Sequence, residues 1–118
     1  MINITLYHNP RCSKSRAALA LLEENDISPE IVLYLDNPPT REELNELLRK
    51  LGIGIRDLLR RSEPEYEQYN LGDSSLSDEI VFEIVGEHPK LIERPIIVRG
   101  ERAVIGRPPE RVLELLVD

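Results

Sequence analysis

The sequence contains 118 residues with 15 basic and 22 acidic side chains, which gives a formal net charge of −7. A chain of this length fits one compact domain over residues 1–118, so we expect one site or one surface to carry the function. The acidic surface should repel nucleic acid and anionic membranes. No segment approaches the roughly 18 apolar residues of a membrane span, and the N-terminus lacks the basic and apolar regions of a secretion signal. We therefore expect a cytoplasmic protein with no nucleic-acid or membrane partner.

The first part of the chain predicts a strand, a helix and a second strand. Alternating apolar residues over 2–6 indicate the first strand. A helical face begins at residue 13, and the polar pair at 25–26 ends it. The nearly continuous apolar run over 31–35 is typical of a strand buried on both faces. Together these elements predict a βαβ unit with parallel strands.

The middle of the chain predicts helices. Thr40 and Glu43 have the spacing of a capping box, apolar residues follow at helical intervals, and Gly52 ends the pattern. Several short helical patterns recur between residues 55 and 86 without a convincing strand. We therefore expect a helical insertion over about residues 40–90.

The last part of the chain predicts a hairpin and a helix. Residues 96–98 and 102–105 are β-rich runs joined by Arg99-Gly100-Glu101. Pro108-Pro109 opens a helix with apolar positions from 112 to 117. The order along the chain is therefore βαβ, a helical block and then ββα, with an antiparallel hairpin in an otherwise parallel sheet. This order predicts an α/β protein with a thioredoxin-like fold.

The only cysteine, Cys12, lies in the predicted loop between the first strand and the first helix. Free backbone N–H groups and the positive end of the helix dipole favour an anion there. His8, Arg11, Lys14 and Arg16 add positive charge, which should lower the thiol pKa below its ordinary value of about 8.5. A lone cysteine is commonly a buried small hydrophobe, but this one lies among polar and charged residues. Cys12 is therefore a candidate nucleophile, and any disulfide that it forms must be with another molecule.

Three arginines stand beside turn or strand-end signals, namely Arg60, Arg94 and Arg107. A guanidinium matches two oxygens of a tetrahedral oxyanion, so three of them around a thiolate suit a phosphate-shaped substrate. Each could equally be a solvated surface charge, and sequence spacing alone does not bring them together. A cis proline stands at the position of Pro95 in thioredoxin-like folds, although trans is the default for an isolated bond to proline.

Several segments resemble the glutaredoxin-linked arsenate reductase (ArsC) family, and the likeness covers nearly the whole chain. The segments are YHNPRCSKSR at 7–16, LYLDNPPTREEL at 33–44, DLLR at 57–60, YEQYNL at 66–71, LIERPIIV at 91–98 and IGRPPERVLELL at 105–116. The RCSKSR form of the loop resembles a chromosomal subgroup. The well-studied resistance enzymes have smaller, uncharged residues in this loop and a C-terminal tail, so a dedicated role in arsenic resistance is not implied.

The resemblance implies a role for each candidate site residue. Cys12 matches the nucleophile, and His8 matches the residue that tunes it. Ser15 and Arg16 match loop positions that support the thiolate. The residues implied to hold the oxyanion and its reduced intermediate are Arg60, Arg94 and Arg107.

The reaction implied by the resemblance is the reduction of arsenate to arsenite through a thiol–arsenate adduct on Cys12. Glutathione is then the reducing co-substrate and glutaredoxin the resolving partner, with no bound cofactor. One cysteine and two histidines, His8 and His88, do not form a recognisable ligand set, so no metal is expected.

Two other functions stay open. Some proteins with a thioredoxin-like fold regulate transcription by docking on RNA polymerase with a CxxC redox switch; here Ser15 replaces the second cysteine, so the sensor is lost but a docking surface is not. A general glutathione-linked thiol oxidoreductase would act on mixed disulfides, and such a substrate does not require three positive charges.

Overall fold

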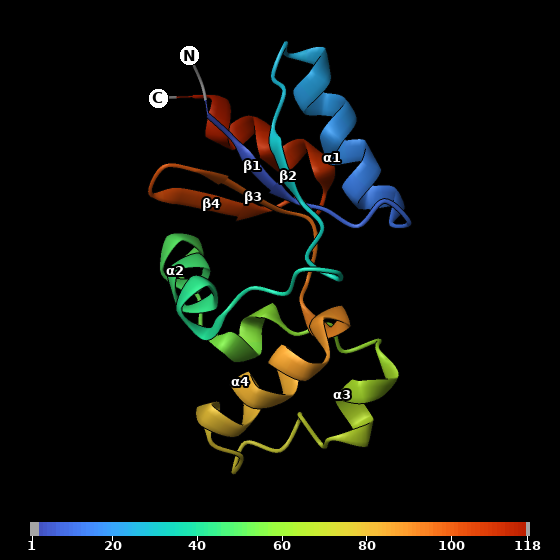
Figure 1. Cartoon of the computed structure of the whole chain (residues 1–118), viewed down its shortest axis with the longest axis vertical. Helices are drawn as coiled ribbons and strands as arrows, with labels where there is room; N and C mark the ends of the chain where they lie inside the picture. Colours follow the sequence, from blue (N-terminus) through green and yellow to red (C-terminus); the bar gives the residue numbers. More distant parts are fainter. Residues whose placement is uncertain (1–2, 118) are drawn as a thin grey trace. The chain divides into compact units, whose positions relative to one another are not determined.

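The computed structural model describes residues 3–117 and divides them into two compact units. One unit combines residues 3–37 with 94–117, and the other contains residues 38–93. Figure 1 shows the elements of both units along the chain. Within the described residues, no helix is long and apolar enough to cross a membrane. The expected single domain over residues 1–118 stays a prediction.

A four-stranded mixed sheet forms the centre of the first unit, in the order β2-β1-β3-β4. The strands are β1 (Thr5–Tyr7), β2 (Glu30–Val32), β3 (Ile96–Arg99) and β4 (Arg102–Ile105). β1 pairs parallel with β2 and antiparallel with β3, and β3 pairs antiparallel with β4. The predicted hairpin is confirmed: Gly100, with a φ of 60°, lies in its two-residue turn, where glycine carries no steric penalty. The mixed sheet with its helices confirms the predicted α/β, thioredoxin-like fold.

β2 differs from the predicted strand. It pairs with β1 alone and is therefore an edge strand, and Ile31 is 44% exposed. The apolar run then leaves the sheet in a turn, where the N–H of Asp36 donates to the carbonyl of Leu33 over 3.0 Å. The predicted second strand is present and parallel to β1, but it covers Glu30–Val32 rather than 31–35. The expectation of burial on both faces was wrong, because an apolar run does not reveal how many neighbours a strand has. β3 holds a central place instead, with three consecutive buried residues.

Two helices cover one face of this sheet, α1 (Ser13–Glu24) and the 3₁₀ helix η3 (Pro109–Leu116) (Figure 1). Residues from both helices and from the strands form one apolar core, which comprises Ile4, Leu6, Ala18, Leu22, Ile27, Ile97, Val104, Val112 and Leu115. α1 begins and ends where its sequence pattern predicts. The last helix is present where predicted but is a 3₁₀ helix. The packed α1 and β1 fix the two ends of the loop that carries Cys12.

The second unit is built from helices, as predicted for the helical block. They are α2 (Arg41–Leu51), η1 (Ile55–Leu58), α3 (Pro64–Gln68), α4 (Asp78–Glu87) and η2 (Pro89–Leu91). The predicted capping box at the start of α2 is present: Glu43 N–H donates to Thr40 Oγ1 over 3.1 Å, and Thr40 N–H donates to Glu43 Oε1 over 2.9 Å. Gly52 ends α2 in the left-handed region with a φ of 72°.

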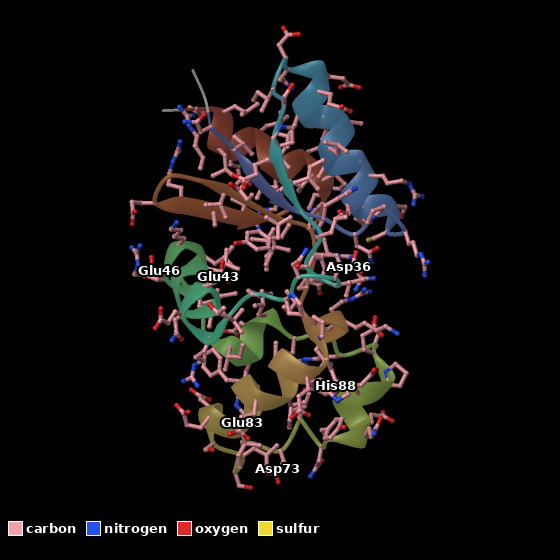
Figure 2. The ribbon with its side chains drawn as sticks, viewed as in Figure 1. Asp36, Glu43, Glu46, Asp73, Glu83 and His88 are labelled. Carbon is pink, nitrogen blue, oxygen red and sulfur yellow. The ribbon has the colours of Figure 1, made fainter. Side chains whose placement is uncertain are left out.

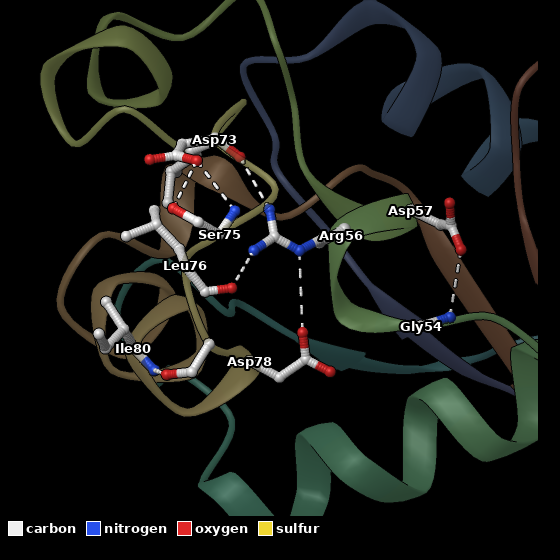
Figure 3. A network of polar contacts seen from close by, with 10 residues as sticks. Gly54, Arg56, Asp57, Asp73, Ser75, Leu76, Asp78 and Ile80 are labelled. Atoms are coloured by element: carbon white, nitrogen blue, oxygen red, sulfur yellow. Dashed lines mark hydrogen bonds and ion pairs between the residues drawn. The ribbon is translucent and has the colours of Figure 1, made fainter.

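Arg56 fastens the segment between α3 and α4 to η1 (Figure 3). Its guanidinium donates to the carbonyls of Leu71 and Leu76 over 3.1 and 2.5 Å and lies 3.8 Å from the Asp78 carboxylate. The guanidinium has several N–H donors, so one side chain holds the non-helical segment between α3 and α4 in place.

His88 lies at the junction of α4 and η2 (Figure 2). Its Nε2 is 3.0 Å from the hydroxyl of Tyr69, and the two rings lie 5.0 Å apart. This histidine is therefore engaged in packing within the helical unit.

Candidate functional site

The loop between β1 and α1 is held in a defined turn by its own polar groups. The side-chain oxygen of Asn9 accepts from the N–H of Arg11 over 3.0 Å, and the backbone carbonyl of Asn9 accepts from the N–H of Cys12 over 3.0 Å. The guanidinium of Arg16 donates to the carbonyl of Pro10 over 2.9 Å. An Asn-Pro pair is typical of such a turn, and the result is a fixed backbone immediately before the candidate nucleophile, Cys12.

Cys12 is the N-cap residue of α1 and is partly exposed. Burial raises the pKa of its thiol, but the N–H groups of Ser15 and Lys14 and the guanidinium of Arg94 lower it, and the net effect is a lowered pKa. The side chains of Arg11 and Lys14 are exposed, and their charges are not among the causes of this shift; Lys14 contributes only through its backbone N–H. The predicted lowering of the thiol pKa therefore holds, but its charged component comes from an arginine distant in sequence.

A second arginine also reaches the sulfur. Arg107 Nη2 lies 3.7 Å from Cys12 Sγ, and Arg107 Nε donates to the carbonyl of Arg94 over 2.7 Å. The Arg107 side chain is thus held at the backbone of Arg94, and both guanidinium groups interact with the same sulfur, although Arg107 is 95 residues from Cys12 in the chain. The peptide bonds Arg94-Pro95 and Arg107-Pro108 are both cis.

Gly106 allows this approach. A Cβ at position 106 would lie 2.8 Å from Pro95 Cγ, closer than side chains tolerate, and 3.1 Å from Ile97 Cδ1, where the isoleucine side chain would have to shift slightly. Its N–H donates to the carbonyl of Pro95 over 2.8 Å. The end of β4 can therefore lie against the start of β3 only because residue 106 has no side chain, and this contact positions Arg107.

His8 is buried and is bound to Ser15. Its Nδ1 lies 2.6 Å from Ser15 Oγ, which also accepts from the N–H of Asn9 over 3.0 Å. Burial, followed by the nearby Arg16 charge, lowers the pKa of His8, so its imidazole favours the neutral form. His8 therefore adds no fixed positive charge beside the sulfur, and any influence on Cys12 passes through Ser15 and the loop.

Arg60 lies in the unit formed by residues 38–93, where two carboxylates surround it. Its Nη1 is 3.5 Å from Glu63 Oε1, and its Nε is 3.5 Å from Glu93 Oε1. The three side chains are only 17%, 21% and 26% exposed. Carboxylates in such pairs oppose the binding of another anion to the same guanidinium. Sequence reasoning missed both carboxylates, which approach Arg60 only in the folded unit.

The structure thus brings Cys12, Arg94 and Arg107 together, with His8 and Ser15 behind the loop. A thiolate beside two guanidinium groups is suited to a nucleophilic attack on a tetrahedral oxyanion, because the positive charges neutralise the anion that the thiolate would otherwise repel. Within residues 3–117, no group of three or more histidine, cysteine or acidic side chains is arranged to hold a metal ion.

Comparisons with known proteins agree with this geometry. The family model described as "ArsC family" matches residues 7–115. The chain is 51% identical over 114 residues to the "Uncharacterized protein YfgD" of Escherichia coli K12, covering 96% of each chain. It is 47% identical over 116 residues to an arsenate reductase of Haemophilus influenzae, covering 98% of this chain and all of that one. A solved structure named arsenate reductase from Vibrio cholerae matches with a TM-score of 0.93 and 51% identity over 96% of this chain and 97% of its own.

Proposed function

Because the chain belongs to the ArsC family, we propose that it is an arsenate reductase whose nucleophile is Cys12. The observation that supports this activity most directly is the sulfur of lowered pKa beside two guanidinium groups. The relatives named arsenate reductase share nearly the full length of the chain, which supports the same substrate here.

In the first step the Cys12 thiolate attacks arsenic and displaces hydroxide or water, which leaves a sulfur–arsenic bond. Arg94 and Arg107 bind the oxyanion and offset its charge during displacement. Arg60 is the third oxyanion ligand suggested by the family resemblance, and it contributes once an anion competes with Glu63 and Glu93.

In the second step the thiolate of glutathione attacks the sulfur of Cys12. A disulfide forms, the sulfur–arsenic bond breaks, and its electron pair stays on arsenic, which is reduced from As(V) to As(III) and leaves as arsenite. Two thiols lose two electrons in total, and one oxygen of arsenate leaves as water. Glutaredoxin then reduces the mixed disulfide on Cys12 by thiol–disulfide exchange, because the chain has no second cysteine.

His8, Ser15 and Arg16 prepare the loop for this chemistry. Ser15 contributes its N–H to the sulfur and its hydroxyl to His8, and Arg16 holds the carbonyl of Pro10. These residues act on the reaction through the shape of the loop that presents Cys12.

The test is arsenite production by the purified protein with arsenate, glutathione, glutaredoxin and a reductase for glutathione. Turnover that requires Cys12 and disappears in Cys12→Ser is expected, and omission of glutaredoxin should slow it. If the thiol reacts readily with iodoacetamide but no arsenite forms, the arsenate assignment is wrong. Release of glutathione from mixed disulfides would then favour a general thiol oxidoreductase.

A further inference from the structure

A pocket of about 360 Å³ lies against the loop that carries the nucleophile, on the side of β2. His8, Asn9 and Arg11 line it from the loop, and Leu33 and Leu35 line it from the chain after β2, together with Pro10 and Asp36. Its volume is within the range of about 300–1,000 Å³ that holds small ligands. Neither Arg94 nor Arg107 lines it, so this pocket is separate from the proposed oxyanion ligands.

The wall of this pocket is preformed. His8 and Asn9 are only 6% and 9% exposed. Ser15 Oγ holds both the imidazole and the Asn9 backbone, and Asn9 Oδ1 holds the N–H of Arg11. Within residues 3–117, the His8 Nε2 has no hydrogen-bond partner. A fixed wall with an available polar atom lowers the ordering cost of binding.

The pocket also carries one charge of each sign. In the part of the chain that the structure describes, neither the Arg11 guanidinium nor the Asp36 carboxylate takes part in a hydrogen bond or ion pair. Apolar surface accompanies the charges, because Leu33 is 38% exposed. Asp36, labelled in Figure 2, lies in the turn that follows β2, where its N–H donates to the carbonyl of Leu33. Opposite charges with aliphatic surface match a short zwitterionic peptide better than an inorganic anion, which Asp36 would repel.

We propose that this pocket binds the reducing thiol as a small zwitterionic peptide of the glutathione kind, with its terminal carboxylate at Arg11 and its α-ammonium at Asp36. The inference rests on the proposed function, since it names the seat of that reaction's second thiol. It also gives a role to Arg11, whose charge is not among the causes of the thiol pKa shift.

The pocket borders Cys12 along the chain without being lined by it. Arg11, in the wall of the pocket, immediately precedes Cys12, and consecutive Cα atoms are about 3.8 Å apart. In a peptide of this kind the thiol lies in the middle residue, so both charged ends can stay bound while the sulfur extends toward Cys12. The step is the one described above: the peptide sulfur bonds to Cys12 Sγ, the sulfur–arsenic bond breaks, and arsenic takes the electron pair.

Binding is tested without turnover by titrating the wild-type protein with S-methylglutathione, whose sulfur cannot react, and following amide shifts by NMR. Arg11→Ala and Asp36→Asn should each weaken binding about three- to fivefold, as expected for a partly exposed charge pair. The matched controls Arg111→Ala and Asp26→Asn remove exposed charges of the same unit outside the pocket and should leave binding unchanged.

A chemical control fixes the orientation. S-methylglutathione with an amidated glycine carboxylate should bind the wild type more weakly and should bind Arg11→Ala and the wild type equally. Equal affinity of the unmodified probe for the wild type, Arg11→Ala and Asp36→Asn would overturn the proposal, as would shifts confined to residues outside the pocket. Arsenite production is measured separately. If the wild-type protein forms no arsenite but binds the probe in an Arg11-dependent way, the proposed activity is refuted and the pocket assignment stands.

Discussion

Removal of the Arg107 charge should make Cys12 measurably less reactive. The side-chain charge that lowers the thiol pKa is that of Arg94; Arg107 Nη2 lies 3.7 Å from the same sulfur, in direct contact unlike Arg11 and Lys14, so its charge should add to that effect. At that separation a charge pair is worth about 1 kcal/mol in water and about 4 kcal/mol at an effective dielectric constant of 20. Because Cys12 is partly exposed, solvent screens the pair and the lower figure applies. Arg107→Gln should therefore reduce the ratio of thiolate to thiol roughly fivefold.

The measurement is the rate of iodoacetamide alkylation as a function of pH, followed by intact mass. At a pH below the thiol pKa the Arg107→Gln protein should react roughly two- to fivefold more slowly, because the loss of thiolate is partly offset by the greater nucleophilicity of a more basic thiolate. At high pH both proteins are fully ionised, so the plateau of Arg107→Gln should be no lower than that of the wild type. Arg107→Lys should lie between the two, since it keeps the charge but loses the hydrogen bond to the carbonyl of Arg94. Arg111→Gln, at an exposed position of the same unit, is the control. Superimposable profiles for the wild type and Arg107→Gln would refute the electrostatic argument.

Three further predictions concern the surroundings of the site. Since burial lowers the pKa of His8, the unfolded chain binds more protons than the native one below about pH 6.5. The wild type should therefore lose stability as pH falls through that range, and His8→Gln should lose less; equal slopes in urea unfolding at pH 5–7 would contradict this. Gly106→Ala places a Cβ 2.8 Å from Pro95 Cγ and should cost about 1–3 kcal/mol, seen as a lower Tm, together with slower alkylation of the thiol. Glu93→Gln leaves Arg60 with one carboxylate, so the Kd for arsenate should fall roughly two- to fivefold. The measurement is calorimetry on phosphate-free protein, and an unchanged Kd would mean that Arg60 takes no part in binding.

The features that sequence predicted well are those with local causes. The capping box of Thr40 and Glu43 and the stop at Gly52 involve residues within one or two helical turns, so the pattern contains the whole interaction. The hairpin around Gly100 is similarly local. The extent and place of β2 were not predicted correctly, because an edge position depends on the strands that pair elsewhere in the sheet.

The candidate site shows the same division. The loop position and chemistry of Cys12 made it a candidate from its neighbours alone. Its meeting with Arg107 spans 95 residues, and only the likeness to a family pointed to it. The carboxylates around Arg60 and the space that Gly106 leaves for Pro95 were not predicted, because both depend on contacts made only in the folded chain.

The start of α1 is less stable than the starts of the other two long helices, because it lacks an N-cap hydroxyl. Side chains of Thr40 and Ser77 cap α2 and α4 with full hydrogen bonds, whereas the N-cap of α1 is Cys12, whose sulfur is near enough to the N–H groups of Ser15 and Lys14 to favour its thiolate but makes no cap hydrogen bond of normal geometry. A hydroxyl at this place is worth about 0.5–2 kcal/mol to a helix. At a pH where the thiol is protonated, Cys12→Ser should therefore melt at a higher temperature than the wild type while losing the proposed nucleophile. Under the proposed function, a cysteine at position 12 therefore gives up helix stability in exchange for a reactive thiol.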